Sequence, residues 1–306
     1  MCNVNNGEHQ MADKNITTQT RLGFIGLGHL GSRIARRLLI AGFPMTVYNR
    51  NRDKTKALEE LGAAVAPDPR KLADRVDVVL SCVPDRAAVE SIYFGPAGVL
   101  RTAQPGTLII EMSTVAPETS RRLYDAARDF GISVLDVAVS GSTVAAETGA
   151  LTLLGGGDLG LFETSTPIFS AIAKQWFYMG PSGSGVAMKL VVNTLLGLGM
   201  QAVAEAVALG SKLGLPREAL FDTLAKTAVV SPVQAAKLAT AKQNDYAPQF
   251  PVRLMDKDFR LILAAAAQVE LSMPATERAA AINFAEAAVG GDEDFSAVIR
   301  RMEQAA

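Results

Sequence analysis

The chain has 306 residues, of which 49% are hydrophobic and 20% are charged, and its formal net charge at pH 7 is −1. This length and apolar content allow a large buried core and predict two domains. The near-zero charge provides no electrostatic footprint for nucleic acid, and the chain lacks a run of about 18 uncharged apolar residues, so we expect a soluble protein without a membrane span.

The first 20 residues are polar and lack the basic-then-apolar order of a secretory signal. We therefore expect residues 1–20 to be a disordered extension outside the fold. The two cysteines, Cys2 and Cys82, argue against a disulfide framework and for a reducing compartment. A cytoplasmic protein is expected.

Only two histidines occur, His9 in the polar extension and His29 within a glycine-rich turn. Dehydrogenases that use a His-Asp pair on the substrate alcohol are therefore excluded, unless His29 leaves this turn. No Cys/His cluster has the spacing of zinc ligands, so we expect no metal site.

The apolar run 22–25 leads into Gly26-x-Gly28-x-x-Gly31, and a helical pattern follows that ends near Gly42. Strand, glycine turn and helix in this order predict a dinucleotide site, because the glycines let the backbone approach a pyrophosphate at a helix N-terminus. The expected cofactor-binding residues of this turn are Gly26, Leu27, Gly28, His29, Leu30 and Gly31.

A second strand is expected at 45–48, and the residues after it select the cofactor. The chain has Asn49-Arg50-Asn51-Arg52 there, whereas a carboxylate would bind the ribose hydroxyls of NAD. An arginine fork suits a 2′-phosphate, so Asn49 and Arg50 are expected to bind NADP(H) in preference to NAD(H), which stays possible. The alternative is a solvated turn with two surface arginines.

Short apolar runs alternate with helical patterns as far as residue 182, which predicts a doubly wound parallel sheet, the Rossmann arrangement, over residues 21–182. The remaining strands are expected at 76–83, 107–111, 132–139, 151–154 and 176–179, and the remaining helices at 53–61, 117–131 and 159–173.

From Gly183 onward the strand patterns stop, and alanine- and leucine-rich stretches predict an all-helical domain over residues 183–306. Gly197 and Gly199 reduce helicity in its first helix, which predicts close packing against another segment. The expected helices cover 186–212, 216–227, 232–240, 252–270, 274–288 and 295–304.

Lys189 and Asn193 lie four residues apart in that first helix, so their side chains share one face. Lys189 is a candidate proton donor in a chain with almost no histidine. The alternative is a solvated lysine, which is the usual state of lysine on a helix.

Seven motifs in one order resemble the β-hydroxyacid dehydrogenase family, which includes 3-hydroxyisobutyrate dehydrogenases and glyoxylate/succinic semialdehyde reductases. The resemblance covers residues 21–304. The motifs are GFIGLGHLG, NRNRDK, CVPD, EMSTVAPET, DVAVSGSTVAAETGALTLLGGG, GPSGSGVAMKLVVN and FPVRLMDKDFRL.

The resemblance implies roles for the matching positions. Lys189 matches the family's catalytic lysine, which donates a proton to the substrate oxygen, and Asn193 matches an asparagine that helps to hold the substrate. The segment that receives the substrate carboxylate matches Ser140, Gly141 and Ser142. The loops beside the nicotinamide match Val83, Ser113 and Thr114, and a cofactor-contacting lysine matches Lys257.

Further details resemble the glyoxylate/succinic semialdehyde reductase branch, in which a phenylalanine and an aspartate contribute to the substrate site. Phe250 and Asp258 match these two positions, and the closing DFSAVI also resembles this branch. Many relatives carry a second glycine where this chain has Ser142.

Structural alternatives exist for several of these residues. Ser140 and Thr143 could cap the following segment. Phe250 could be a core residue. Asp258 could be a surface partner of Arg260 or of a neighbouring lysine.

The expected activity is NADPH-dependent reduction of a small carboxylate-bearing aldehyde or keto acid to the hydroxy acid, or the reverse oxidation. An imine reductase of the same architecture and a non-catalytic cofactor-binding module remain alternatives, and a 6-phosphogluconate dehydrogenase would need a much larger helical domain. The apolar helical domain favours a homodimer or homotetramer.

Overall fold

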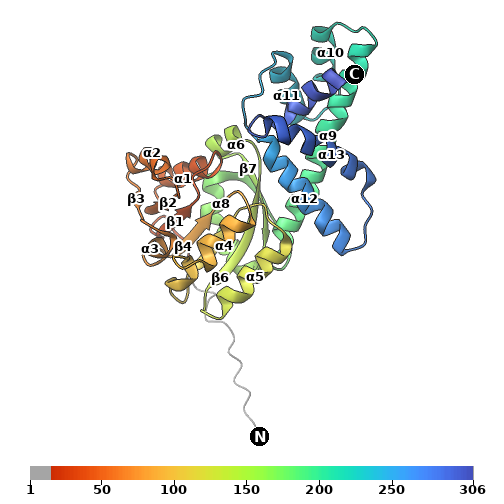
Figure 1. Cartoon of the computed structure of the whole chain (residues 1–306). Coiled ribbons are helices and arrows are strands. Elements are labelled where there is room, and N and C mark those ends of the chain that lie inside the picture. Colours follow the sequence, from red (N-terminus) through yellow and green to blue (C-terminus); the bar gives the residue numbers. More distant parts are fainter. Residues whose placement is uncertain (1–14, 306) are drawn as a thin grey trace. The chain divides into compact units, whose positions relative to one another are not determined.

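The computed structural model describes residues 15–305 and divides into two compact units, Met1–Lys189 and Leu190–Ala306 (Figure 1). The first 14 positions of the extension predicted at residues 1–20 lie outside the described residues. For residues 15–20 the prediction is wrong, because Ile16 is buried in the hydrophobic core of the first unit. Each unit has its own hydrophobic core.

The first unit is built on one eight-stranded sheet with the order β3-β2-β1-β4-β5-β6-β7-β8. The chain therefore reverses its direction of strand addition between β1 and β4, the arrangement that creates a ligand crevice in open α/β sheets. The strands are β1 Leu22–Ile25, β2 Met45–Tyr48, β3 Ala64–Val65, β4 Val78–Ser81, β5 Leu108–Glu111, β6 Ser133–Ser140, β7 Leu151–Gly156 and β8 Ala173–Tyr178.

All neighbouring strands pair in parallel except β6 and β7, which are antiparallel with Val137 opposite Gly155. The prediction of a doubly wound sheet is confirmed, and its fully parallel character is wrong at this one junction. Ten residues join β6 to β7. A parallel crossover needs about a dozen residues or more, so the short connection returns the chain antiparallel.

Helices cover both faces of this sheet, which is why its strands read as unbroken apolar runs. Leu58, Phe162 and Phe169 pack into the core on one face, and Leu72, Val89 and Leu123 into the core on the other. The first face carries α1 Gly31–Ile40, α2 Lys56–Glu59, α6 Thr143–Thr148, α7 Leu159–Thr164 and α8 Thr166–Ile172; the second carries α3 Pro69–Ala73, α4 Arg86–Phe94 and α5 Pro117–Arg128.

The helix predicted at 159–173 is in fact two helices, α7 and α8, that meet at Ser165. Pro167 lies in the first turn of α8 and has no N–H to continue the earlier helix. The hydroxyl of Thr166 instead donates to the carbonyl of Glu163 at 2.7 Å. The sequence patterns also missed β3, α3, α4 and α6, which are short elements between stronger signals.

The second unit is helical, as predicted, and the first of its helices begins in the preceding unit. Gly197 packs against Phe259 and Gly199 against Gln234 so closely that a Cβ at either glycine would overlap the neighbouring side chain, which confirms the packing prediction. The helices are α9 Ser184–Lys212, α10 Arg217–Leu224, α11 Pro232–Lys242, α12 Val252–Gln268, α13 Pro274–Gly290 and α14 Val298–Ala305, with the 3-10 turn η3 at Phe295–Ala297.

By length and composition α9 could cross a membrane, but 44% of its most apolar window is buried inside the protein. Core helices of water-soluble domains meet the same criterion, so the length and hydropathy of α9 do not show whether the protein is in a membrane.

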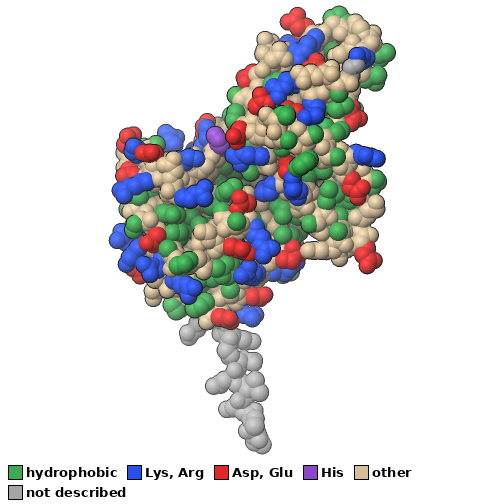
Figure 2. Space-filling view, viewed as in Figure 1, with side chains coloured by type: hydrophobic (Ala, Val, Ile, Leu, Met, Phe, Trp, Pro, Cys, Tyr) green, Lys and Arg blue, Asp and Glu red, His purple; other side chains and the backbone are tan. Residues whose placement is uncertain are grey.

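Figure 2 shows basic and acidic side chains interspersed over the face in view, in keeping with the formal net charge of −1.

Candidate active site

The predicted cofactor residues follow the carboxyl ends of neighbouring strands in the first unit. Ile25 at the end of β1 is in register with Tyr48 of β2 and with Ser81 of β4, and Ser81 is in register with Glu111 of β5. Parallel strands that end in register bring the loops after them to one edge of the sheet, where open α/β proteins bind ligands.

The glycine turn at this edge has the geometry that its sequence predicts. Gly26 has φ +97°, and a Cβ there would overlap the carbonyl of Cys82, while a Cβ at Gly31 would overlap the carbonyl of Gly26. Gly28 is different, because a Cβ at this position would meet no atom within 4 Å. The backbone is therefore open to a ligand at Gly28, and the other two glycines keep the turn tight.

The N-terminus of α1 beside this turn is suited to an anion. No side chain caps the helix at Leu30, and its first turn contains no acidic residue. Backbone N–H groups and the helix dipole then favour a phosphate. The residues present therefore fit the pyrophosphate of a dinucleotide.

Asn49 ties the glycine turn to the end of β2. Its Oδ1 accepts a hydrogen bond from Leu27 N–H at 2.9 Å, and its Nδ2 donates to the carbonyl of Asn51 at 2.8 Å. The nearby carboxylate of Asp53 is paired with Lys56 at 2.7 Å. Arg50 and Arg52 are exposed next to this segment.

The loops after β4 and β5 are hydrogen-bonded to each other. Ser113 Oγ accepts the N–H of Val83 at 2.8 Å, and Ser113 N–H donates to Oε1 of Glu111 at 2.9 Å. Burial raises the pKa of the Glu111 carboxyl to about 7, against the opposing effect of hydrogen bonds from Ser113 and Ser81. The sequence motifs assigned no role to Glu111. The one feature in the sequence that could have indicated it is an acidic residue at the end of the apolar strand β5.

The segment Ser140–Ser142 lies at the carboxyl end of β6, whose last residue is Ser140. Gly141 has φ +145°, and a Cβ there would lie 2.8 Å from a methyl of Leu151, so only glycine fits. Ser142 Oγ accepts Ala145 N–H at 3.2 Å and caps α6. The capping alternative therefore applies to Ser142, whereas it was expected of Ser140 and Thr143.

Arg33 connects this segment's helix to the glycine turn. Its guanidinium contacts Glu147 of α6 and donates to the carbonyl of His29, each at 2.6 Å. His29 itself is exposed. Arg33 thus links the helix that follows the expected substrate loop to the turn expected to hold cofactor.

The start of α9 is anchored by Asp136, a buried residue of β6. Its two oxygens accept the N–H groups of Gly183 at 2.7 Å and Val186 at 3.0 Å. Burial raises the pKa of Asp136, and these backbone hydrogen bonds oppose the rise. Lys189 lies one turn further along α9 with 9% of its surface exposed, so the solvated-lysine alternative is wrong.

Asn193 is one turn beyond Lys189 and hydrogen-bonds Asp258 of α12 in the second unit. The distance from Asn193 Nδ2 to Asp258 Oδ2 is 2.6 Å, and Lys257 Nζ lies 2.9 Å from Asp258 Oδ1. Arg260 pairs with Asp256 at 3.0 Å, so Arg260 is not the partner of Asp258. The pairing with a neighbouring lysine is present, but the Asp258 carboxylate is buried, with 1% of the residue exposed, and does not lie at the surface.

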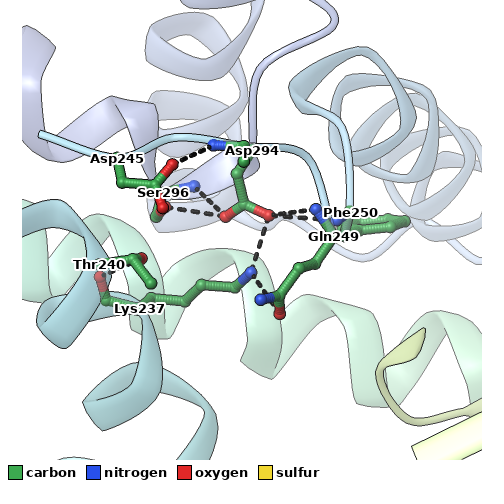
Figure 3. A network of polar contacts seen from close by, with 8 residues as sticks. Lys237, Thr240, Asp245, Gln249, Phe250, Asp294 and Ser296 are labelled. Carbon is green, nitrogen blue, oxygen red and sulfur yellow. Dashed lines mark hydrogen bonds and ion pairs between the residues drawn. The ribbon is translucent and has the colours of Figure 1, made fainter. Parts of the chain in front are cut away.

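Phe250 lies in a second cluster of the helical unit, shown in Figure 3. Its ring meets Phe295 edge-on at 5.7 Å, and its N–H donates to Oδ2 of Asp294 at 3.1 Å. Asp294 also accepts from Lys237 Nζ at 2.7 Å and from Gln249 N–H at 3.1 Å. Sequence reasoning missed Lys237, which the pattern of α11 does not distinguish from surface lysines.

Within residues 15–305, no group of three or more His, Cys, Asp or Glu side chains is placed to hold a metal ion.

Two family models match the chain almost end to end. The model of the NAD binding domain of 6-phosphogluconate dehydrogenase matches residues 21–180. A second model, described as "NAD-binding of NADP-dependent 3-hydroxyisobutyrate dehydrogenase", matches residues 183–302.

Among curated relatives, glyoxylate/succinic semialdehyde reductase 1 of Arabidopsis thaliana is 37% identical, over 92% of this chain and 98% of its own length. An NAD-dependent L-serine dehydrogenase of Pseudomonas aeruginosa is 35% identical over 83% and 88%. The crystal structure of a 3-hydroxyisobutyrate dehydrogenase from Salmonella typhimurium superposes with a TM-score of 0.86 at 27% identity, covering 92% and 100%.

Proposed function

The chain belongs to the β-hydroxyacid dehydrogenase family, and we propose that it reduces a small carboxylate-bearing aldehyde or keto acid to the hydroxy acid with NADPH, or catalyses the reverse oxidation. Substrates of the glyoxylate or succinic semialdehyde type are proposed, since the Arabidopsis relative of that name matches over nearly its whole length. An NAD(P)-dependent oxidoreductase acting on a CH–OH/C=O couple is the broader class.

The observation that carries this proposal is the burial of Lys189, a cationic side chain, on the apolar helix α9. Burying an ammonium costs free energy, so its retention there points to a role. In the proposed reduction, Lys189 donates a proton to the carbonyl oxygen as negative charge develops on it, and then regains a proton from solvent. Bound NADPH supplies the hydride.

Asn193 is proposed to orient the substrate oxygen. Its Nδ2 is committed to Asp258, and its Oδ1 has no hydrogen-bond partner among the described residues. A buried acceptor of this kind suits the hydroxyl of a hydroxy acid. Because Asp258 binds Nδ2 of Asn193, Oδ1 is the amide atom that faces that hydroxyl.

The substrate carboxylate is assigned to Ser140–Ser142. Because Ser142 Oγ already caps α6, the backbone N–H groups of this segment and the hydroxyl of Ser140 are the proposed donors. Gly141 supports this role, since its backbone conformation turns the chain sharply at the end of β6.

NADP(H) is the proposed cofactor, with NAD(H) as the weaker one. Arg50 and Arg52 provide two exposed guanidinium groups beyond β2, and the nearby Asp53 carboxylate is neutralised by Lys56. A 2′-phosphate therefore meets positive charge there. The serine dehydrogenase relative is NAD-dependent, and kinetics with both cofactors measure the preference of this chain.

The test is steady-state kinetics with NADPH and NADH against glyoxylate, succinic semialdehyde and a cyclic imine. We expect turnover of the aldehyde acids with NADPH. Lys189→Ala should lower kcat by about 10² to 10⁴, because general acid catalysis supplies that much, with the affinity for NADPH unchanged. Lys212→Ala, an exposed lysine at the end of the same helix, is the control.

Full turnover by Lys189→Ala would refute the proton-donor assignment. Turnover confined to the imine would favour the imine reductase alternative. NADPH binding without turnover of any substrate in the panel would favour the binding module. A cytoplasmic location and a homo-oligomeric state remain predictions.

A further inference from the structure

A row of polar side chains crosses the buried sheet of the first unit just below the cofactor edge. Ser81, Glu111 and Asp136 are in register on β4, β5 and β6, so they point to the same face. All three are essentially inaccessible, and the proposed chemistry uses none of them. Buried polar groups in a strand need an explanation.

The two carboxyl groups of this row have different surroundings. Asp136 holds the N-terminal turn of α9 through both of its oxygens. Glu111 Oε1 accepts from Ser113 N–H at 2.9 Å and from Ser81 Oγ at 3.2 Å, whereas Oε2 is buried without a hydrogen-bond partner among the described residues. Tyr93 closes the network, with its hydroxyl 2.6 Å from Ser81 Oγ.

Short contacts lead from Glu111 to the cofactor edge. Glu111 fixes Ser113, whose Oγ accepts Val83 N–H at 2.8 Å. A Cβ added to Gly26 would come within 2.9 Å of the Val83 side chain, so Val83 packs directly against the glycine turn. One buried carboxyl thus holds the loops after β4 and β5 in place against the turn after β1.

We propose that Glu111 is a positioning residue for the cofactor: through Ser113 and Val83 it sets the loops between which the nicotinamide is placed. This rests on the proposed function for the position of the nicotinamide. The hydrogen bonds themselves belong to the described structure and do not depend on that function.

The neutral carboxyl is the form that this site accommodates. Among the residues that the structure describes, no donor reaches Oε2 to stabilise a negative charge, and desolvation raises the pKa of Glu111 to about 7. The titratable groups that face it are Tyr93 from α4 and Asp136 from β6. Ionised Glu111 would have to draw in water or another donor, and Ser113 would move with it.

The experiment compares Glu111→Gln, Glu111→Ala and the wild type by NADPH fluorescence titration between pH 6 and 8.5. Glutamine keeps an acceptor for Ser113 and cannot ionise, so we expect wild-type affinity at pH 6 and no change up to pH 8.5. The wild type should bind NADPH several-fold more weakly as the pH rises through about 7. Glu111→Ala should bind roughly tenfold more weakly at every pH, because buried donors lose their acceptor.

Ile109→Ala is the matched packing control, since Ile109 is buried on the same strand and the same face. It should destabilise the fold and leave the affinity for NADPH near the wild-type value. The proposal is overturned if Glu111→Ala and Ile109→Ala change affinity equally. Matching pH profiles for the wild type and Glu111→Gln would overturn it too, even if the alanine variant fails to fold.

Cofactor titration also separates this proposal from the proposed activity. Absence of turnover in the wild type would refute the activity and leave the binding comparison intact. Full turnover combined with unchanged NADPH affinity in Glu111→Ala would refute the role of Glu111 alone.

Discussion

Nδ2 of Asn193 donates a 2.6 Å hydrogen bond to Oδ2 of Asp258, although 65 residues of chain separate these two side chains. Each residue is 1% exposed, so water does not replace this hydrogen bond. The carboxylate holds the amide of Asn193, whose Oδ1 has no hydrogen-bond partner within residues 15–305. The resemblance implied a substrate role for both residues, and their mutual hydrogen bond shows how one could depend on the other.

The first prediction separates the acceptor of Asp258 from its charge. Asp258→Ala removes the partner of a buried amide, which costs about 1–3 kcal/mol, and should raise the KM for the aldehyde acid about tenfold as Asn193 loses its orientation. Asp258→Asn keeps an acceptor oxygen and should have a milder effect. Steady-state kinetics on both variants provide the measurement.

Asp256→Ala is the control, because Asp256 lies two residues earlier on α12 and pairs with the exposed Arg260. It should change KM by less than twofold, as surface ion pairs contribute about 0–1 kcal/mol. Equal effects of Asp258→Asn and Asp258→Ala would show that charge, and not orientation of Asn193, is what matters.

The second prediction concerns cofactor choice. Arg50→Ala with Arg52→Ala should raise the KM for NADPH by about tenfold or more, since each charge-assisted hydrogen bond to a phosphate contributes roughly 1.5–3 kcal/mol. The KM for NADH should change little. Arg128→Ala, an exposed arginine of α5, is the control. An equal loss with both cofactors would contradict the 2′-phosphate assignment.

Much of the first unit could be predicted because its signals are local. Leu22–Ile25 and the three glycines after it specify strand, turn and helix within ten residues, and the φ of Gly26 is the one that the turn requires. The antiparallel direction of β7 could not be read in this way. It depends on the length of the connection from β6 and on which edge of the sheet remains free.

Partnerships between distant side chains were the least predictable part of the site. Lys237 and Lys242 lie on the same helix and look alike in sequence, yet the side chain of Lys237 is 7% exposed and pairs with Asp294, 57 residues later. Asp294 is the N-cap residue of the turn η3, which precedes α14 and lies outside α11. A pattern within α11 contains no information about a partner so distant in sequence.

The third prediction uses this contrast between the two lysines. Lys237→Met leaves the Asp294 carboxylate buried with its cation removed, which should destabilise the protein by about 3–5 kcal/mol. Lys242→Met breaks an exposed pair with Asp222 and should cost less than about 1 kcal/mol. Thermal unfolding of the two variants measures the difference.

Asp294 also holds the backbone of Phe250, so the same network bears on substrate selection. Asp294→Asn should alter the ratio of kcat/KM between succinic semialdehyde and glyoxylate, because the longer substrate meets more of the proposed wall. If this ratio stays at the wild-type value while stability falls, Phe250 is a core residue, as its packing against Phe295 also allows.

The final prediction follows from the raised pKa of Glu111. In the unfolded chain this carboxyl titrates near 4.5, and in the folded protein near 7, so the folded protein binds more protons between these values. Stability should therefore fall as pH rises from about 4.5 to 7 and then level off. The whole effect is at most about 3.5 kcal/mol, since one pKa unit corresponds to about 1.4 kcal/mol. Glu111→Gln cannot ionise, and the raised pKa of Asp136 is common to both proteins. The variant should thus gain several degrees in Tm over the wild type between pH 5 and pH 8; a difference in Tm independent of pH would mean that Glu111 is already ionised at pH 5.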